Sequence, residues 1–154
     1  MPTTTDTIHK QIVLRAPRSR VWRALTDTAE FGAWFGVRIE GEFKPKARLV
    51  MQGTTKGCGH PDMRVDILIE RVEPERLFSY RWHPGAVDPK IDYSREPLTL
   101  VEFQLEELAE GTRLTVVESG FDRLPPERRD TALRMNDGGW NSQIKNIEQH
   151  VSAG

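Results

Sequence analysis

One glutamate is placed where a carboxylate could do chemistry inside the protein. In the segment RLTVVES, alternation puts Leu114, Val116 and Glu118 on one face of a strand. If that face is buried, desolvation raises the pKa of the Glu118 carboxyl, and the group could serve as a general acid or base. The alternative is a glutamate near a strand end that reaches solvent or an arginine. Glu118 is therefore a candidate catalytic residue with both interpretations open.

Two amides fall on the apolar side of the last predicted helix, residues 124–151. At 100° intervals, Asn136 lies on the same stripe as Trp140 and Ile144, and Gln143 lies at its margin. A buried amide without a hydrogen-bond partner costs roughly 1–3 kcal/mol. The sheet, water or a ligand must therefore supply partners for both amides.

The same predicted helix is interrupted by two adjacent glycines. Gly138 and Gly139 each cost up to about 1 kcal/mol relative to alanine inside a helix. Three explanations are open, namely close approach of a strand, room for a ligand beside Trp140, or a simple kink.

A short loop carries residues of the types that bind metals. The stretch CGHPD places Cys58, His60 and Asp62 at alternate positions, with His83 as a further donor. Their spacing fits no established zinc motif, and a hairpin loop rich in glycine and proline explains the stretch better. The sequence contains no phosphate-binding glycine loop, nucleophile elbow or hydrolase triad. We therefore predict neither a metal site nor a cofactor.

Composition argues against several classes of protein. The chain has 154 residues, of which 37% are hydrophobic and 29% charged, with a formal net charge of -1. This balance argues against a nucleic-acid surface, and no apolar run reaches membrane-spanning length. The N-terminus lacks the layout of a signal peptide, and the single cysteine fits a reducing compartment. We expect one cytoplasmic domain over residues 1–154, with residues 1–6 flexible and no membrane insertion.

Strands and helices are predicted to position these candidate residues. Two-residue periodicity indicates strands at 7–16, 37–43, 47–54, 63–72, 76–82, 98–108 and 112–121. The short turns between most of them predict an antiparallel meander. Two short helices follow the first strand, and Asp27 and Glu30 are predicted to be the N-cap and capping-box partner of the second. The long connection 83–97, with Ile91 and Tyr93 available for packing, is either a docked structural flap or a functional one.

This order of elements and several motifs resemble a known superfamily. The motifs APRSRVWRALTD followed by WFG, YRWHPGAVDP, LTLVEFQLEE, GTRLTVVESGF, and GGW in the last helix are similar to START-like (SRPBCC) helix-grip domains. The likeness runs from Ile8 to Val151 and points to the branch named for the activator of the 90-kDa heat-shock protein ATPase, in its bacterial single-domain form. It implies an α+β helix-grip fold of the Bet v 1 type. In that fold a curved seven-stranded antiparallel sheet grips the C-terminal helix around an internal cavity.

The resemblance and the inward faces of the predicted elements imply a ligand-binding interior. The superfamily includes lipid carriers, hormone receptors, aromatase/cyclases and chaperone activators, so the fold alone does not fix the activity. We expect a small hydrophobic or amphipathic molecule to bind there. The predicted lining residues are Trp34, Phe35, Met51, Ile67, Tyr80, Trp82, Phe103, Asn136, Trp140, Gln143 and Ile144. The alternative for the aromatic residues is that they are simply core.

Two other functions stay open. By the family it resembles, the chain could be a co-chaperone of a heat-shock chaperone in the stress response. The eukaryotic activators carry an additional N-terminal domain, however, for which this chain has no room. It could also be a polyketide cyclase/aromatase-type or hydrolase-type enzyme that uses Glu118. We favour a binding module over an enzyme, as a monomer or, through an open sheet edge, a homodimer.

Overall fold

The computed structural model describes residues 7–53, 64–84, 90 and 92–152. Its strands form one antiparallel sheet in the order β1-β7-β6-β5-β4-β3-β2. Their bounds are β1 (Thr7–Leu14), β2 (Val37–Ile39), β3 (Arg48–Gly53), β4 (Arg64–Glu73), β5 (Leu77–Trp82), β6 (Thr99–Leu108) and β7 (Gly111–Ser119). From β2 to β7, strands that follow one another in the chain are neighbours in the sheet, which confirms the predicted meander.

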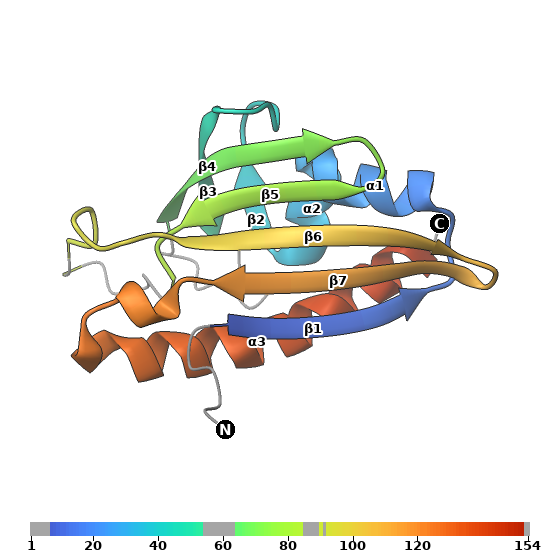
Figure 1. Cartoon of the computed structure of the whole chain (residues 1–154). Helices are drawn as coiled ribbons and strands as arrows, with labels where there is room; N and C mark the ends of the chain where they lie inside the picture. Colours follow the sequence, from blue (N-terminus) through green and yellow to red (C-terminus); the bar gives the residue numbers. More distant parts are fainter. Residues whose placement is uncertain (1–6, 54–63, 85–89, 91, 153–154) are drawn as a thin grey trace, which may run out of the picture.

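The helices cover a single face of this sheet (Figure 1). After β1 come α1 (Arg18–Thr26) and α2 (Thr28–Phe35), and after β7 come a 3-10 helix (Phe121–Arg123) and α3 (Pro126–Ser152). The 27 residues of α3 span about 40 Å, which is enough for the helix to run along the sheet beside β1. No helix in the described part of the chain is both long and apolar enough to cross a membrane. The predicted helix-grip fold is confirmed.

Three strands end two or more residues before their predicted ends. The strand predicted at 7–16 ends at Leu14. The strand predicted at 37–43 ends at Ile39, because Gly41 has a φ of 107° and turns the chain away from the ladder. The strand predicted at 112–121 ends at Ser119, and Phe121 begins the 3-10 helix after Gly120, which has a φ of 105°.

The short helix α2 depends on its caps and on tertiary packing. Helices of fewer than about 12 residues are marginal alone in water, and α2 has 8 residues. Asp27 accepts hydrogen bonds from the backbone N–H groups of Ala29 (2.9 Å) and Glu30 (3.1 Å), which confirms the predicted N-cap. The capping-box prediction for Glu30 is wrong, because the backbone N–H of Asp27 donates to the Arg23 carbonyl instead.

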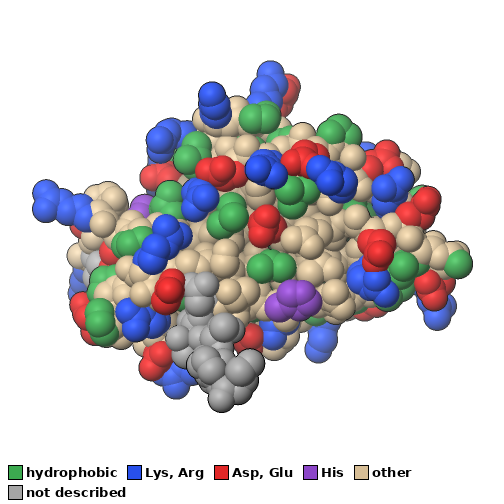
Figure 2. Space-filling model, in the orientation of Figure 1, with side chains coloured by type: hydrophobic (Ala, Val, Ile, Leu, Met, Phe, Trp, Pro, Cys, Tyr) green, Lys and Arg blue, Asp and Glu red, His purple; other side chains and the backbone are tan. Residues whose placement is uncertain are grey.

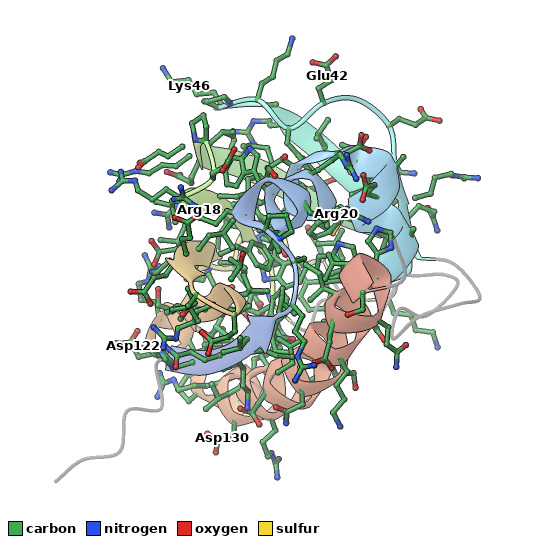
Figure 3. All side chains as sticks on the ribbon, turned by 90° about the vertical axis from the view of Figure 1, so that its right-hand side faces the viewer. Arg18, Arg20, Glu42, Lys46, Asp122 and Asp130 are labelled. Atoms are coloured by element: carbon green, nitrogen blue, oxygen red, sulfur yellow. The ribbon has the colours of Figure 1, made fainter. Side chains whose placement is uncertain are left out.

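The Glu30 side chain joins three helices rather than closing a cap. It binds Arg20 (2.6 Å) and Arg23 (2.8 Å) of α1 and His150 (2.9 Å) in the last turn of α3. Burial raises the pKa of the Glu30 carboxyl, but the hydrogen bonds from His150, Arg20 and Arg23 outweigh that effect and leave the pKa below its ordinary value. Figure 3 views this end of the molecule and labels Arg20. The cluster fastens the C-terminal end of α3 to the helix pair.

Aromatic rings of α2 form the centre of the core. The Phe31 side chain is fully buried, and its ring centroid lies 4.8 Å from Trp34, 4.9 Å from Phe35 and 5.5 Å from Phe43. Aromatic pairs of this kind contribute roughly 0.5–1.5 kcal/mol beyond their buried area. The indole of Trp34 donates to the Ala24 carbonyl at 2.8 Å. Two helices that are marginal alone are thus stabilised by packing against each other and against the sheet.

Candidate functional site

Glu118 is the only fully buried charged side chain among the described residues, with 0% of its surface exposed. In the strand register it lies between Ile8 of β1 and Val101 of β6, which are both buried. A charge in such apolar surroundings is costly unless hydrogen bonds hold it.

Four side chains from three elements donate hydrogen bonds to this carboxylate. Oε2 accepts from Trp82 Nε1 of β5 at 2.7 Å and from Thr99 Oγ1 of β6 at 2.5 Å. Oε1 accepts from Trp140 Nε1 of α3 at 2.8 Å. Asn136 Nδ2, one turn earlier on α3, lies 2.9 Å from Oε1 and 3.0 Å from Oε2. All four donors are neutral, so these contacts tie α3 to the sheet without a counter-ion.

Burial changes the acidity of this group. Desolvation raises the pKa of the Glu118 carboxyl above its ordinary value, although the hydrogen bonds from Thr99, Trp140, Trp82 and Asn136 each favour the charged form. The prediction that Glu118 points inward is confirmed. The alternative, a strand-end glutamate that reaches solvent or an arginine, is wrong. Its use in catalysis stays a prediction.

Four aromatic rings surround the same region. The ring centroids of Trp82 and Trp140 lie 6.0 Å apart at an angle of 33°. The Phe35 ring lies 6.1 Å from Trp82 and 5.9 Å from Trp140, with its plane steeply inclined to both. Phe103 packs edge-on to Trp140 at 5.7 Å. The carboxylate therefore lies at the edge of an aromatic cluster to which α2, α3 and two strands contribute.

The predicted lining residues all lie in or against the core. Asn136 and Ile144 are half-buried, and the remainder are buried, namely Trp34, Phe35, Met51, Ile67, Tyr80, Trp82, Phe103, Trp140 and Gln143. The two amides have protein partners, since Asn136 donates to Glu118 and Gln143 Nε2 donates to the Phe35 carbonyl at 2.8 Å. Contact of these residues with a ligand stays a prediction.

Thr99 belongs to this site although no motif in the sequence indicates it. The side chain is fully buried and makes the shortest of the hydrogen bonds to Glu118. Thr99 precedes Val101 and Phe103 at two-residue spacing, which places it on the inward face of β6. The signal in the sequence is therefore the inward-facing row of β6 residues, which extends by one two-residue step to Thr99 at the start of the strand.

The paired glycines of α3 do not mark a close contact with a described strand. No described atom outside the helix lies within 4 Å of a Cβ placed at Gly138 or Gly139. Close approach of a strand is therefore the wrong explanation, and space beside Trp140 and a kink stay open.

The described part of the long connection 83–97 is docked on the first turns of α3. The Arg128 guanidinium binds the Glu96 carboxylate at 2.7 Å and donates to the Pro84 carbonyl at 2.8 Å. Its centre lies 4.7 Å from the Tyr93 ring centroid, and only 15% of the Arg128 side chain and 16% of that of Glu96 are exposed. We call these contacts the Arg128 clasp. They support the docked alternative for residues 92–97.

Several sequence predictions fall outside the described residues. These are the flexible N-terminus 1–6, the metal-type residues Cys58, His60 and Asp62, and the packing role of Ile91. His83 is described, and its Nε2 lies 3.2 Å from the Glu96 carbonyl oxygen, next to the Arg128 clasp.

Two hollows of the described residues lie on the convex, solvated face of the sheet. The larger, of about 660 Å³, lies over β3, β4 and β5, where Val50, Asp66 and Arg81 line it. The smaller, of about 390 Å³, lies over β2, β3 and the start of β4, beside Arg38 and Arg64. Figure 2 shows basic and acidic side chains interspersed across this face. Neither hollow is lined by the residues that surround Glu118, which face the helices.

Comparisons with known proteins identify the family and agree on the fold. A family model described as activator of Hsp90 ATPase homolog 1-like protein matches residues 15–152. A solved structure from Mesorhizobium loti has a TM-score of 0.75 at 23% identity, covering 96% of this chain and 97% of that one. One from Nitrosomonas europaea has a TM-score of 0.72 at 19% identity, covering 99% and 97%. DynU16, a protein in the dynemicin biosynthetic locus, has a TM-score of 0.73 at 24% identity, covering 98% of this chain and 48% of its own. No curated protein matches the sequence.

Proposed function

The chain belongs to the family of activator of Hsp90 ATPase homolog 1-like proteins, and we propose that it binds a small hydrophobic or amphipathic molecule between the sheet and α3. The observation that carries this proposal is a buried carboxylate, Glu118, beside the rings of Phe35, Trp82 and Trp140. Binding sites for small molecules are mostly apolar and contain a few fixed polar groups.

Ligand binding would explain why a carboxylate is buried here, whereas the stability of the folded protein does not. An apolar side chain of similar volume is often as stable as a buried charged group, or more so. Glu118 has no counter-ion among the described residues, and its pKa is raised by burial. Perturbed ionisable groups in enclosed surroundings cluster at functional sites. The apolar part of a ligand would pack against the aromatic rings, and its polar part would face Glu118.

Thermal unfolding in the presence of a library of apolar and amphipathic compounds tests this proposal. A ligand at about 100 times its Kd stabilises the folded state by about 2.7 kcal/mol, which raises the Tm of a domain of this size by several degrees. We expect at least one class of compound to produce such a shift. A library without any effect on Tm would contradict the proposal.

A matched pair of tryptophan variants locates the binding site. Trp82→Phe keeps an aromatic ring but removes the donor to Glu118, and it is expected to weaken the shift produced by the best compound. Trp22→Phe changes a half-buried residue of α1 away from this cluster, and it is expected to leave the shift unchanged. Equal effects of the two substitutions would place the ligand elsewhere.

The family match favours a second candidate function, that of a co-chaperone. Such a protein would act through an exposed face rather than through its interior. The test is the ATPase rate of the Hsp90-type chaperone from the same host, measured with and without this protein. An increase that persists in Trp82→Phe would favour the co-chaperone, and an unchanged rate would count against it.

An enzyme of the cyclase or hydrolase type is the third candidate. Its single supporting feature is the Glu118 carboxyl, whose pKa is raised by burial, as is common for carboxyl groups that act as general acids or bases. If a bound molecule is identified and found to be converted, Glu118→Gln must abolish that conversion. Conversion at the wild-type rate by Glu118→Gln would exclude this role.

A further inference from the structure

The geometry around Glu118 points to a ligand that carries a primary or secondary amine, which takes the place of the Asn136 amide at the carboxylate. This inference rests on the proposed function and specifies the chemical class of its ligand. It depends on charge, on the exposure of the donors and on the number of N–H groups that the carboxylate requires.

Charge selects the class of polar group. Among the described residues, Glu118 is the one Asp, Glu, Lys, Arg or His side chain that is fully buried, so the interior carries an acidic group and no basic one. Its partners are two indoles, a hydroxyl and an amide, which are all neutral. In surroundings of low dielectric constant, a cation at hydrogen-bonding distance is strongly attracted to a carboxylate, and an anion is repelled. The interior should therefore prefer basic amphiphiles to fatty acids or phosphate esters.

One of the four side chains that donate hydrogen bonds to Glu118 is placed so that a ligand could replace it. Trp82, Thr99 and Trp140 are 9%, 0% and 3% exposed and are held within the core. Asn136 is half-buried and extends from α3. Its Nδ2 lies 2.9 and 3.0 Å from the two carboxylate oxygens, so it occupies the position that bridges them. An ammonium nitrogen in that position would reach both oxygens once the Asn136 side chain turned outward.

Space next to this position is available on the same helix. Gly139 follows Asn136 by three residues, and residues three apart are neighbours on a helix surface. A Cβ at Gly139 would meet no described atom within 4 Å. If the amine of an amphiphile replaced the Asn136 amide, the apolar chain of the amphiphile could run along this side of α3. The glycine, which costs helix stability, would then have the role of leaving space for that chain.

The hydrogen-bond requirement distinguishes kinds of amine. Displacing Asn136 leaves both carboxylate oxygens short of a donor, and buried acceptors need replacement donors. A primary or secondary ammonium group carries enough N–H groups to serve both oxygens, whereas a quaternary ammonium group carries none. Nearby aromatic rings attract either cation through their faces, so the N–H groups decide between the two.

Isothermal titration calorimetry with four ligands of equal chain length tests the inference. The probes are decylamine, decyltrimethylammonium, decanol and decanoic acid, each below its micelle concentration at neutral pH. We expect decylamine to bind about tenfold or more tightly than decanol, and decanoic acid to bind most weakly. Equal affinities for decylamine, decanol and decanoic acid would overturn the inference while supporting the proposed function. Absence of binding by all four would overturn the inference and count against the proposed function as well.

Variants of two residues separate the roles of the carboxylate and the amide. Glu118→Gln is expected to bring the affinities for decylamine and decanol together. Asn136→Ala frees the bridging position and is expected to strengthen decylamine binding, with Asn141→Ala on the exposed side of α3 as the control. If Glu118→Gln fails to fold, as judged by circular dichroism, the affinity of Asn136→Ala for decylamine tests the inference by itself. Weaker decylamine binding by that variant would overturn the inference.

Discussion

At the scale of single residues, Glu118 makes stability depend on pH. Its pKa is raised in the folded protein, so the folded state keeps the proton at pH values where the unfolded chain has lost it. The stabilisation from this group is therefore fully present below its ordinary pKa and is lost as the pH rises through the folded-state pKa.

Urea unfolding of the wild-type protein and of Glu118→Gln, measured from acidic to neutral pH, checks this prediction. The free energy of unfolding of the wild type minus that of the variant should fall as the pH rises. Taking this difference cancels the opposite contribution of Glu30, whose pKa is lowered. Glu148→Gln, on the exposed side of α3, is the control for the loss of one carboxyl group. A difference that rises with pH would contradict the burial of an uncompensated carboxylate.

Thr99 is expected to matter more for stability than its small size suggests. Thr99→Val keeps the shape of the side chain but removes the hydroxyl that donates to Glu118 at 2.5 Å. Losing a hydrogen bond to a charged group costs about 1.5–3 kcal/mol. Chemical denaturation at neutral pH should show this loss, and Thr131→Val at an exposed position should show little change. Equal stability of Thr99→Val and wild type would show that the hydroxyl does not support the carboxylate.

The sequence indicates which individual residues of this site point inward, but it does not indicate that their side chains contact the same carboxylate. Alternation along β7 points Glu118 inward, and helical periodicity points Asn136 and Trp140 inward. That Trp82 and Thr99 reach the same carboxylate depends on the strand register between β5 and β6 and on where α3 crosses the sheet. No local pattern in the sequence encodes those two quantities.

At the scale of elements, two helical glycines are expected to respond in opposite ways to alanine. Gly138 is exposed, and a Cβ there would meet no described atom within 4 Å, so Gly138→Ala should stabilise α3 by up to about 1 kcal/mol. At Gly32 of α2 a Cβ would lie 2.4 Å from the Val37 carbonyl oxygen. Gly32→Ala should therefore destabilise the protein, because the helix and the start of β2 must separate.

Thermal unfolding of the two alanine variants measures both effects. A lower Tm for Gly138→Ala would mean that the flexibility or the space at that position is required for folding. An unchanged Tm for Gly32→Ala would mean that α2 and β2 are less tightly packed than the structure shows.

The Arg128 clasp predicts a local change rather than a global one. Arg128→Met removes the ion pair with Glu96 and the hydrogen bond to the Pro84 carbonyl. Hydrogen exchange at the Glu96 amide, which donates to the Tyr93 carbonyl at 2.9 Å, should become faster while the sheet stays protected. Arg134→Met, at an exposed position on the same helix, is the control. Unchanged exchange in Arg128→Met would show that residues 92–97 are held by other contacts.

Local sequence rules predict helices and strands well where the contacts that determine them are between residues close in the sequence. Asp27 is an N-cap because its side chain reaches amides two and three residues ahead. Glu30 departs from its predicted role because arginines of α1 and a histidine 120 residues away compete for its carboxylate. Long-range ion pairs of this kind cannot be found from spacing along the chain.

At the scale of the whole molecule, the two faces of the sheet have different chemistry. The convex face carries both signs of charge in contact with solvent (Figure 2), whereas the face that packs against α3 is apolar apart from a few polar residues such as Glu118 and Thr99. The fold was predictable because short turns impose a meander and a long amphipathic helix must bury its stripe. The identity of a ligand was not predictable, because it depends on how several elements close around one group.

Native mass spectrometry of the protein purified gently from its own host tests ligand binding in the interior most directly. The wild-type protein should carry a non-covalent small molecule that is lost on denaturation, and Trp82→Phe should carry less of it. A wild-type spectrum with only the mass of the polypeptide, both as purified and after incubation with an extract of host small molecules, would contradict the proposed binding function.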